Sequence, residues 1–139
     1  MLNQKNAMRL FVFTIVLTTS ILCAKDVQAG TASYTAKCSF IDKGKPNGGN
    51  ISKMPCYAVE GGNMYSIFFH ILWKDGVKTQ LNMRSDSPLK DFTTKKVYKR
   101  ISSYKFVAVS DGDIIFLEDV KYNELRYNLD DPMAAKLLK

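Results

Sequence analysis

After Cys56, apolar and polar residues alternate with a period of two, the period of a β-strand with one buried face. Segments 64–73 and 77–83 are rich in aromatic and β-branched residues, and the three residues 74–76 lie between them. With these three as the loop and Gly76 left-handed, the apolar side chains gather on one face, whereas a two-residue loop scatters them over both. The sequence therefore predicts a hairpin with the pairs Trp73–Val77, Ile71–Thr79, Phe69–Leu81 and Ile67–Met83.

One face of this hairpin carries a stripe of large apolar side chains: Tyr65, Ile67, Phe69, Ile71 and Trp73. We interpret the stripe as part of the protein core. The alternative is that it lines a ligand cavity, as such stripes do in small barrels. The opposite face is mixed in polarity.

A second hairpin is predicted over segments 104–109 and 114–118. A two-residue turn at Asp111-Gly112 gives the pairs Val109–Ile114, Val107–Phe116 and Lys105–Glu118. Both faces are largely apolar, so we expect this hairpin near the centre of the sheet. Around it, the pattern predicts a turn at 85–88, an edge strand at 93–101 and a last strand at 120–129.

One short helix is predicted at the end of the chain, with Asp131 as its cap and Pro132 as its first residue. Helical periodicity is not found elsewhere after residue 29. We therefore expect an all-β, mainly antiparallel fold in a single small domain, either a sandwich or a barrel.

The first 29 residues have the pattern of a signal peptide. Lys5 and Arg9 precede an apolar run of about 15 residues, too short to span a bilayer as a helix. Val27 and Ala29 then place small residues at a cleavage site. We expect a signal peptide at 1–29 and an exported domain at 30–139, periplasmic or secreted, and we favour a bacterial source. Cleavage after Ala24 and an uncleaved membrane anchor are the alternatives.

Removal of this segment changes the charge and the cysteine count. The net charge falls from +7 to about +5. Cys38 and Cys56 remain as an even pair, which in an oxidising compartment predicts a disulfide. That bond closes a loop of about 18 residues, rich in Gly, Pro and Asn, and is expected to contribute about 3 kcal/mol.

Residues that could carry catalysis are few. His70 is the only histidine, and it lies mid-strand on the mixed face of the first hairpin. A hydrolase would need it beside a nucleophile and an acid, and a zinc site would need three or four ligands. The acidic pairs fall in turns and at strand ends, where carboxylates are solvated. The sequence predicts a non-enzymatic protein without metal or cofactor.

The densest charge cluster is the basic run at 95–100, in which Lys96, Tyr98 and Arg100 share one face of a strand. A contact with an acidic protein or another anionic surface is one interpretation. The other is an edge strand that its lysines protect from aggregation. Nucleic acid is not an expected partner. The candidate partner-contact residues are Lys95, Lys96, Lys99, Arg100, Tyr65 and His70.

Two sequence resemblances bear on function. The order Cys38, Cys56 and then Trp73-Lys74-Asp75-Gly76 resembles small exported bacterial proteins of uncharacterised function. The stretch Gly61-Gly62-Asn63-Met64-Tyr65, followed by Trp73, resembles the lysozyme inhibitors of Gram-negative envelopes. Those are β-barrels whose inhibitory loop reads Ser-Gly-x-x-Tyr. The resemblance implies that Gly62 and Tyr65 lie in such a loop, although Gly61 stands where the family has serine.

Taken together, these patterns predict an exported, non-enzymatic binding protein. An inhibitor or immunity-type protein of an envelope enzyme is its most concrete form. A structural component of an envelope or secretion assembly is the alternative, and a small hydrolase is a less favoured one.

Overall fold

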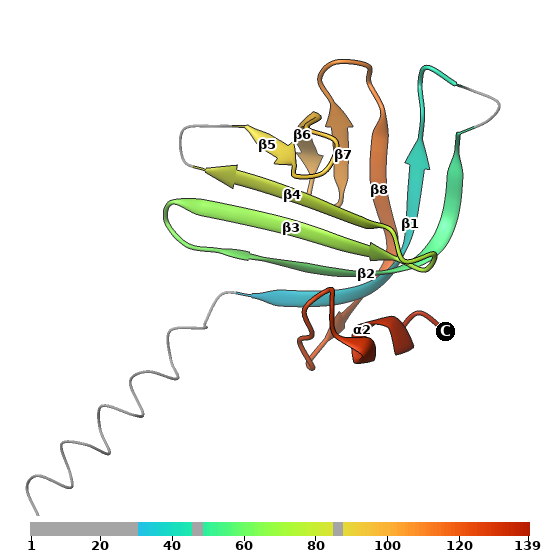
Figure 1. Cartoon of the computed structure of the whole chain (residues 1–139), viewed down its shortest axis with the longest axis vertical. Coiled ribbons are helices and arrows are strands. Elements are labelled where there is room, and N and C mark those ends of the chain that lie inside the picture. Colours follow the sequence, from blue (N-terminus) through green and yellow to red (C-terminus); the bar gives the residue numbers. More distant parts are fainter. Residues whose placement is uncertain (1–30, 46–48, 85–87) are drawn as a thin grey trace, which may run out of the picture.

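The computed structural model describes residues 31–45, 49–84 and 88–139. Eight strands follow one another in the chain, each pairs antiparallel with the next, and β8 pairs with β1 to close a barrel (Figure 1). The strands are β1 (Ala32–Ile41), β2 (Ile51–Gly62), β3 (Ser66–Trp73), β4 (Lys78–Arg84), β5 (Leu89–Asp91), β6 (Val97–Ser102), β7 (Lys105–Ala108) and β8 (Ile114–Asn123). The predicted all-β antiparallel class is confirmed, and of the two architectures expected, the barrel is the one observed.

The barrel interior is filled by alternate side chains from its strands, as the period of two requires. Phe69, Ile71 and Trp73 of the predicted stripe are buried in it, whereas Tyr65 and Ile67 are exposed. The core interpretation of the stripe therefore holds for its second half, and Trp73 also lines a cavity at one end of the barrel.

The β3–β4 hairpin has the predicted register, with Ile71 opposite Thr79 and Phe69 opposite Leu81. The Trp73 amide donates to the Val77 carbonyl at 2.9 Å across the three-residue loop. Gly76 has φ = 89°, a left-handed conformation that favours glycine. Turn chemistry and the facing of the apolar residues together determine this hairpin.

The predicted register of the second hairpin is wrong by two residues. Val107 pairs with Ile114 rather than Phe116, and the Ala108 amide donates to the Asp113 carbonyl at 2.8 Å, so four residues form the loop. The cause is Asp113, whose buried side chain makes hydrogen bonds that a two-residue turn would remove. A shift of two keeps every side chain on its predicted face. A closed barrel has no central or edge strands, so the position expected for this hairpin near the centre of the sheet does not apply.

The predicted edge strand at 93–101 is also wrong. Residues 92–96 form a turn, in which the Lys95 amide donates to the Asp91 carbonyl, and the strand begins at Val97. β6 pairs on both sides, with β5 and with β7. The last strand predicted at 120–129 is not a separate strand either. In the described chain, β8 continues to Asn123 through an irregularity at Asp119, where φ is 50°.

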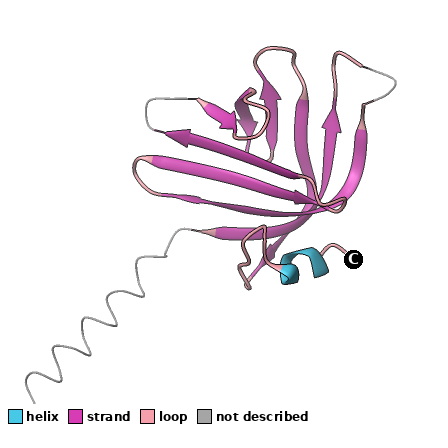
Figure 2. Cartoon of the chain, viewed as in Figure 1, coloured by secondary structure: helices cyan, strands magenta, loops and turns pink. Residues whose placement is uncertain are grey.

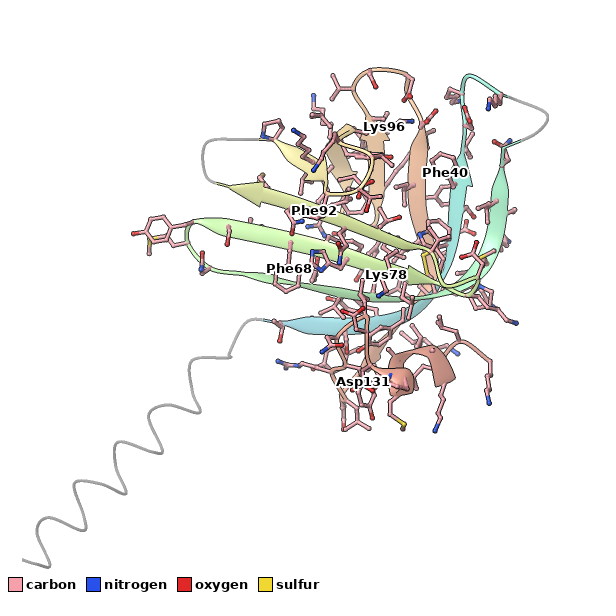
Figure 3. All side chains as sticks on the ribbon, in the orientation of Figure 1. Phe40, Phe68, Lys78, Phe92, Lys96 and Asp131 are labelled. Atoms are coloured by element: carbon pink, nitrogen blue, oxygen red, sulfur yellow. A yellow bond between two sulfur atoms is a disulfide. The ribbon has the colours of Figure 1, made fainter. Side chains whose placement is uncertain are left out.

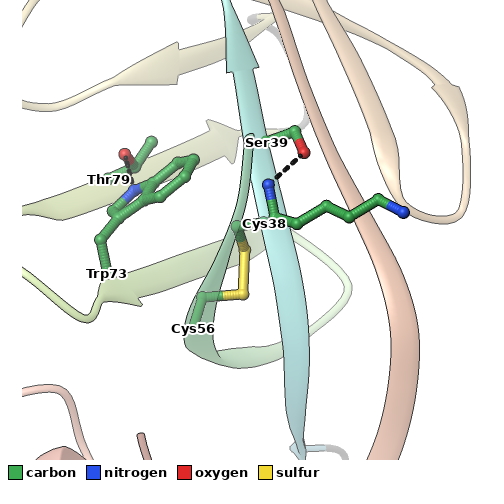
Figure 4. The surroundings of a disulfide bond; sticks show 6 residues. Cys38, Ser39, Cys56, Trp73 and Thr79 are labelled. Atoms are coloured by element: carbon green, nitrogen blue, oxygen red, sulfur yellow. Dashed lines mark hydrogen bonds between the residues drawn. A yellow bond between two sulfur atoms is a disulfide. The ribbon is translucent and has the colours of Figure 1, made fainter. Parts of the chain in front are cut away.

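The disulfide is formed as predicted. Cys38 and Cys56 are both fully buried and join β1 to β2, and Cys56 lies opposite Trp73 on β3 (Figure 4).

The terminal helix α2 (Pro132–Lys136) is confirmed, with the Asp131 side chain accepting a hydrogen bond from the Met133 amide. Figure 2 shows this helix in cyan and the strands in magenta. The segment around it covers the outer wall of β2 and β3 in a second apolar cluster: Tyr57, Leu72, Leu129, Ala134 and Leu138.

Two features predicted from the sequence fall on residues that the structure does not describe. The signal peptide expected at 1–29 lies outside the described residues, and so does most of the turn expected at 85–88. In the described part of the chain, no helix is long and apolar enough to cross a membrane.

The two ends of the barrel differ in their contents. We call one end the mouth; the β3–β4, β5–β6 and β7–β8 connections form it, at residues 74–77, 92–96 and 109–113. We call the opposite end the plugged end, and there Tyr34, Glu60 and Arg100 meet.

Candidate functional site

A cavity of about 210 Å³ lies inside the barrel at its mouth. Eight-stranded barrels have interiors wide enough for packed side chains or one small ligand. Pockets for drug-sized ligands measure about 300–1,000 Å³, so this one suits a smaller group, of the size of one side chain. Its lining consists of Phe40, Ile51, Trp73, Asp75, Val77, Thr79, Asp91, Thr94, Lys96, Tyr98 and Ile115.

Three aromatic residues line the cavity from different strands: Phe40 from β1 (Figure 3), Trp73 from β3 (Figure 4) and Tyr98 from β6. The Trp73 indole N–H donates to the Thr79 hydroxyl at 3.0 Å, which fixes the indole. These rings give the cavity an aromatic lining.

The Tyr98 hydroxyl is the unused polar group of this lining. Tyr98 is only 5% exposed, and its hydroxyl has no hydrogen-bond partner among the described residues. The hydroxyl oxygen is not completely buried, because every completely buried side-chain nitrogen or oxygen in the described chain has a hydrogen-bond partner. Burial raises the pKa of Tyr98 to about 12, so the hydroxyl keeps its proton at neutral pH and can donate it.

Asp91 provides a buried carboxylate to the cavity. It is 4% exposed and accepts hydrogen bonds from the Thr94 hydroxyl at 2.6 Å, the Thr94 amide at 3.1 Å and the Gln80 amide at 3.2 Å. Within residues 31–45, 49–84 and 88–139, no basic side chain forms an ion pair with it. Its charge is held by hydrogen bonds rather than by a cation.

Lys96 is the cation of the lining, and it is already paired. Its ammonium lies 2.8 Å from Asp111 and 2.6 Å from the buried Asp113, both from the β7–β8 connection. Hydrogen bonds to these carboxylates raise the pKa of Lys96, and the same contact lowers the pKa of Asp111. The ammonium therefore stays charged and fixed at one side of the mouth.

The plugged end contains a bonded network instead of a cavity lining. The Arg100 guanidinium lies over the rings of Phe69 and Phe106, at 5.3 and 5.4 Å from their centroids. It donates to Glu60 at 2.9 Å and to the carbonyl of Ser103 at 2.7 Å. The Tyr34 hydroxyl donates to the other Glu60 oxygen at 2.9 Å, and burial and this acceptor raise its pKa.

The β2–β3 connection forms a tight tip beside the plugged end. The Asn63 side chain accepts hydrogen bonds from the amides of Tyr65 and Ser66, at 2.8 and 3.0 Å. Gly62 is required here, because a Cβ at this position would lie 2.3 Å from the Ser66 carbonyl oxygen. Met64 and Tyr65 are 87% and 70% exposed at this tip. The tip is thus held in shape while its two large side chains face solvent.

The predicted basic run does not form one surface. Lys96 and Arg100 share the interior-facing side with Tyr98, as expected, but they lie at opposite ends of the barrel and in ion pairs. Lys95 and Lys99 are exposed outside, and the Lys95 ammonium lies 4.6 Å from the Phe92 ring centroid. Two of the four basic residues, Lys95 and Lys99, are therefore exposed and form no ion pair among the described residues.

His70 lies on the outer wall of β3, where its Nε2 is 2.9 Å from the side-chain oxygen of Asn82 and its ring is beside Phe68. It is not part of the cavity lining. Among the described residues, no group of three or more His, Cys, Asp or Glu side chains is placed to hold a metal ion.

Several residues that shape the site escape prediction from the sequence. The pattern predicts a solvated turn carboxylate at Asp113, yet this side chain is buried. Asp91 is not among the predicted site residues, although an Asp three residues before Thr94 is a recognisable turn signal. For Glu60, no sequence signal points to Arg100, since the contact depends on how the barrel closes.

Comparison of the chain with protein-family models, with curated proteins and with solved structures gives no match. The two resemblances noted from the sequence therefore stay predictions.

Proposed function

We propose that this protein is an exported, non-enzymatic binding protein whose β2–β3 tip contacts an envelope or extracellular protein. An inhibitor or immunity-type protein of an envelope enzyme is its most concrete form. The observation that carries this proposal is the exposure of Met64 and Tyr65 side by side on a tip that Asn63 holds in place.

Preorganisation is the physical reason to assign binding to the tip. A segment that is already ordered loses little entropy on association. Aromatic side chains and methionine are enriched at interfaces, and a few buried anchors supply most of the binding energy. The resemblance to lysozyme inhibitors also assigns Gly62 and Tyr65 to a contact loop, and both residues lie at this tip.

The hydroxyl and thiol groups near the mouth support binding over catalysis. Cys38 and Cys56 are joined, the Thr79 hydroxyl accepts from Trp73, and the Thr94 hydroxyl donates to Asp91. His70 is on the outer wall with Asn82. This distribution favours an interaction protein over the small hydrolase.

A structural role in an envelope assembly is the second candidate, and the outer wall of β6 to β8 favours it. Ile101 on β6 is 55% exposed, Val109 in the adjoining β7–β8 connection is 68% exposed, and Val107, Ile114 and Phe116 are half-buried. A wall of this kind is suited to contact with a further subunit.

The tip is tested by partner capture with the full chain, exported and tagged after Lys139. Intact mass of the purified protein reports whether residues 1–29 are removed, as export requires. Tyr65→Ala is expected to lower the affinity for the captured envelope protein about 30-fold, the loss typical of an interface anchor. Phe92→Ala, at the other end and 65% exposed, is the matched control and is expected to change the affinity less than about twofold. Capture that is insensitive to Tyr65→Ala, or that yields no partner, would contradict the proposal.

A further inference from the structure

We infer that the mouth cavity is a binding site for an organic ammonium group about the size of one amino-acid side chain. This site is separate from the tip and goes beyond the proposed protein contact. The cavity combines the two kinds of group that recognise organic cations, namely aromatic faces and carboxylates. Phe40, Trp73 and Tyr98 line the cavity with aromatic rings, and Asp75 and Asp91 supply the carboxylates.

The buried carboxylate of Asp91 is the observation that most favours a cationic ligand. A buried carboxylate is costly unless it is paired, and hydrogen bonds alone only partly offset that cost. Asp91 accepts three hydrogen bonds and, in the described residues, has no cation beside it. An ionised carboxylate has about four acceptor sites, so one remains for a ligand ammonium.

Asp75 adds a second carboxylate at the rim. It lies in the exposed β3–β4 turn, where one of its oxygens accepts a hydrogen bond from the Val77 amide at 3.1 Å. It too forms no ion pair among the described residues. Its carboxylate adds a solvent-accessible negative charge to the lining.

The charge balance of the cavity lining disfavours an anion. The one ammonium of the lining, that of Lys96, faces Asp111 and Asp113, so its charge is more than offset. Asp75 and Asp91 then make the cavity acidic within a chain whose net charge is +7. An anionic ligand would meet uncompensated carboxylates here.

The polar groups also disfavour a neutral apolar ligand. Such a ligand would leave the Asp91 charge uncompensated and the Tyr98 hydroxyl without a partner, and unpaired polar groups in a closed site weaken binding. An ammonium compound that carries a hydroxyl or carbonyl oxygen satisfies both, because the Tyr98 hydroxyl can donate to that oxygen.

Trp73 provides a direct assay, since it is the only tryptophan of the chain and lines the cavity. The purified full chain is titrated with choline chloride and with n-butylammonium chloride at constant ionic strength. Tryptophan fluorescence is expected to change saturably with both. The neutral isostere of choline, with a tert-butyl group in place of trimethylammonium, is expected to bind about tenfold more weakly or not at all.

Substitutions at the cavity sharpen the test. Asp91→Asn is expected to weaken cation binding about tenfold, and Tyr98→Phe to weaken choline binding several-fold. Because Asp91 also holds the 92–96 turn, Asp75→Asn serves as a second variant with little risk to the fold, and a several-fold loss is expected. Asp119→Asn and Tyr122→Phe, both outside the lining, are the matched controls and are expected to leave affinity unchanged.

Equal binding of cation and isostere overturns the inference, and so does the absence of a saturable change. Affinity that is insensitive to both Asp75→Asn and Asp91→Asn also overturns it. Tighter binding of Nα-acetyl-lysine amide than of choline would assign the site to a lysine side chain of a peptide, and the reverse order to a free amine. Partner capture through Tyr65 is measured separately, so either result can fail without the other.

Discussion

The two ends of the barrel contain the same kinds of side chain and use them differently. At the plugged end, Arg100, Glu60 and Tyr34 bond to one another, and the guanidinium lies over two aromatic rings. At the mouth, the Asp91 carboxylate has hydrogen bonds but no cation, and the Tyr98 hydroxyl has no partner in the described part of the chain.

The two ends differ because their basic side chains, Arg100 and Lys96, reach different partners. Arg100 reaches across the interior to Glu60 on β2, whereas Lys96 turns to the β7–β8 connection and pairs with Asp111 and Asp113. A buried polar group that is paired within the protein contributes to stability, and one left unpaired can contribute to binding. Substitutions in the Tyr34–Glu60–Arg100 network should therefore lower stability, and those of the cavity residues Asp75 and Tyr98 should mainly lower ligand affinity.

The largest expected effect in this comparison comes from the disulfide, which lies nearer the mouth because Cys56 is opposite Trp73. Replacing Cys38 and Cys56 together by serine should cost about 3 kcal/mol, given the separation of 18 residues. Urea unfolding measures the loss. Hydrogen exchange should show more opening in the mouth halves of β1 and β2 than at Tyr34 and Glu60. A loss below about 1 kcal/mol would contradict the entropic argument.

A smaller effect is expected at the plugged end from Glu60→Gln, which removes the anionic partner of Arg100. The Arg100 and Glu60 side chains are 32% and 26% exposed, so solvent compensates part of the loss, and about 1–2 kcal/mol is expected. Asp130→Asn is the matched control, because the Lys78–Asp130 pair is at the surface and should change stability by less than about 0.5 kcal/mol. Equal effects of the two variants in thermal unfolding would remove the special role of the plug.

The local parts of this architecture are predictable from the sequence. The β3–β4 register depends on Gly76 and the facing of its apolar residues, and the helix start depends on Asp131 and Pro132. Even where the predicted β7–β8 register is wrong, the faces are right, because a shift of two preserves them. The disulfide is predictable too, from the even pair of cysteines that remains if the expected signal peptide is removed.

The features that the sequence does not predict depend on closure of the barrel. The edge expected at 93–101 is absent because β6 pairs with both β5 and β7, and pairing of β8 with β1 brings segments far apart in the chain together. Glu60 and Arg100 are 40 residues apart, and Lys96 and Asp113 are 17 apart. No local pattern marks such pairs, so the mouth and the plug become visible only in three dimensions.

The smallest expected effect is the acid sensitivity of the mouth, carried by Asp111. A hydrogen bond from Lys96 lowers the pKa of this carboxyl from its ordinary value of 3.8, so the folded state holds the charged form more strongly than the unfolded chain does. Its contribution to stability is complete above that value and is lost as the pH falls through the lower, folded pKa. Asp111→Asn should therefore flatten the decline in melting temperature between about pH 5 and pH 2, whereas Asp119→Asn should not. The change will be slight because Asp111 is 38% exposed, and equal pH profiles for the two variants would place the acid sensitivity elsewhere in the barrel.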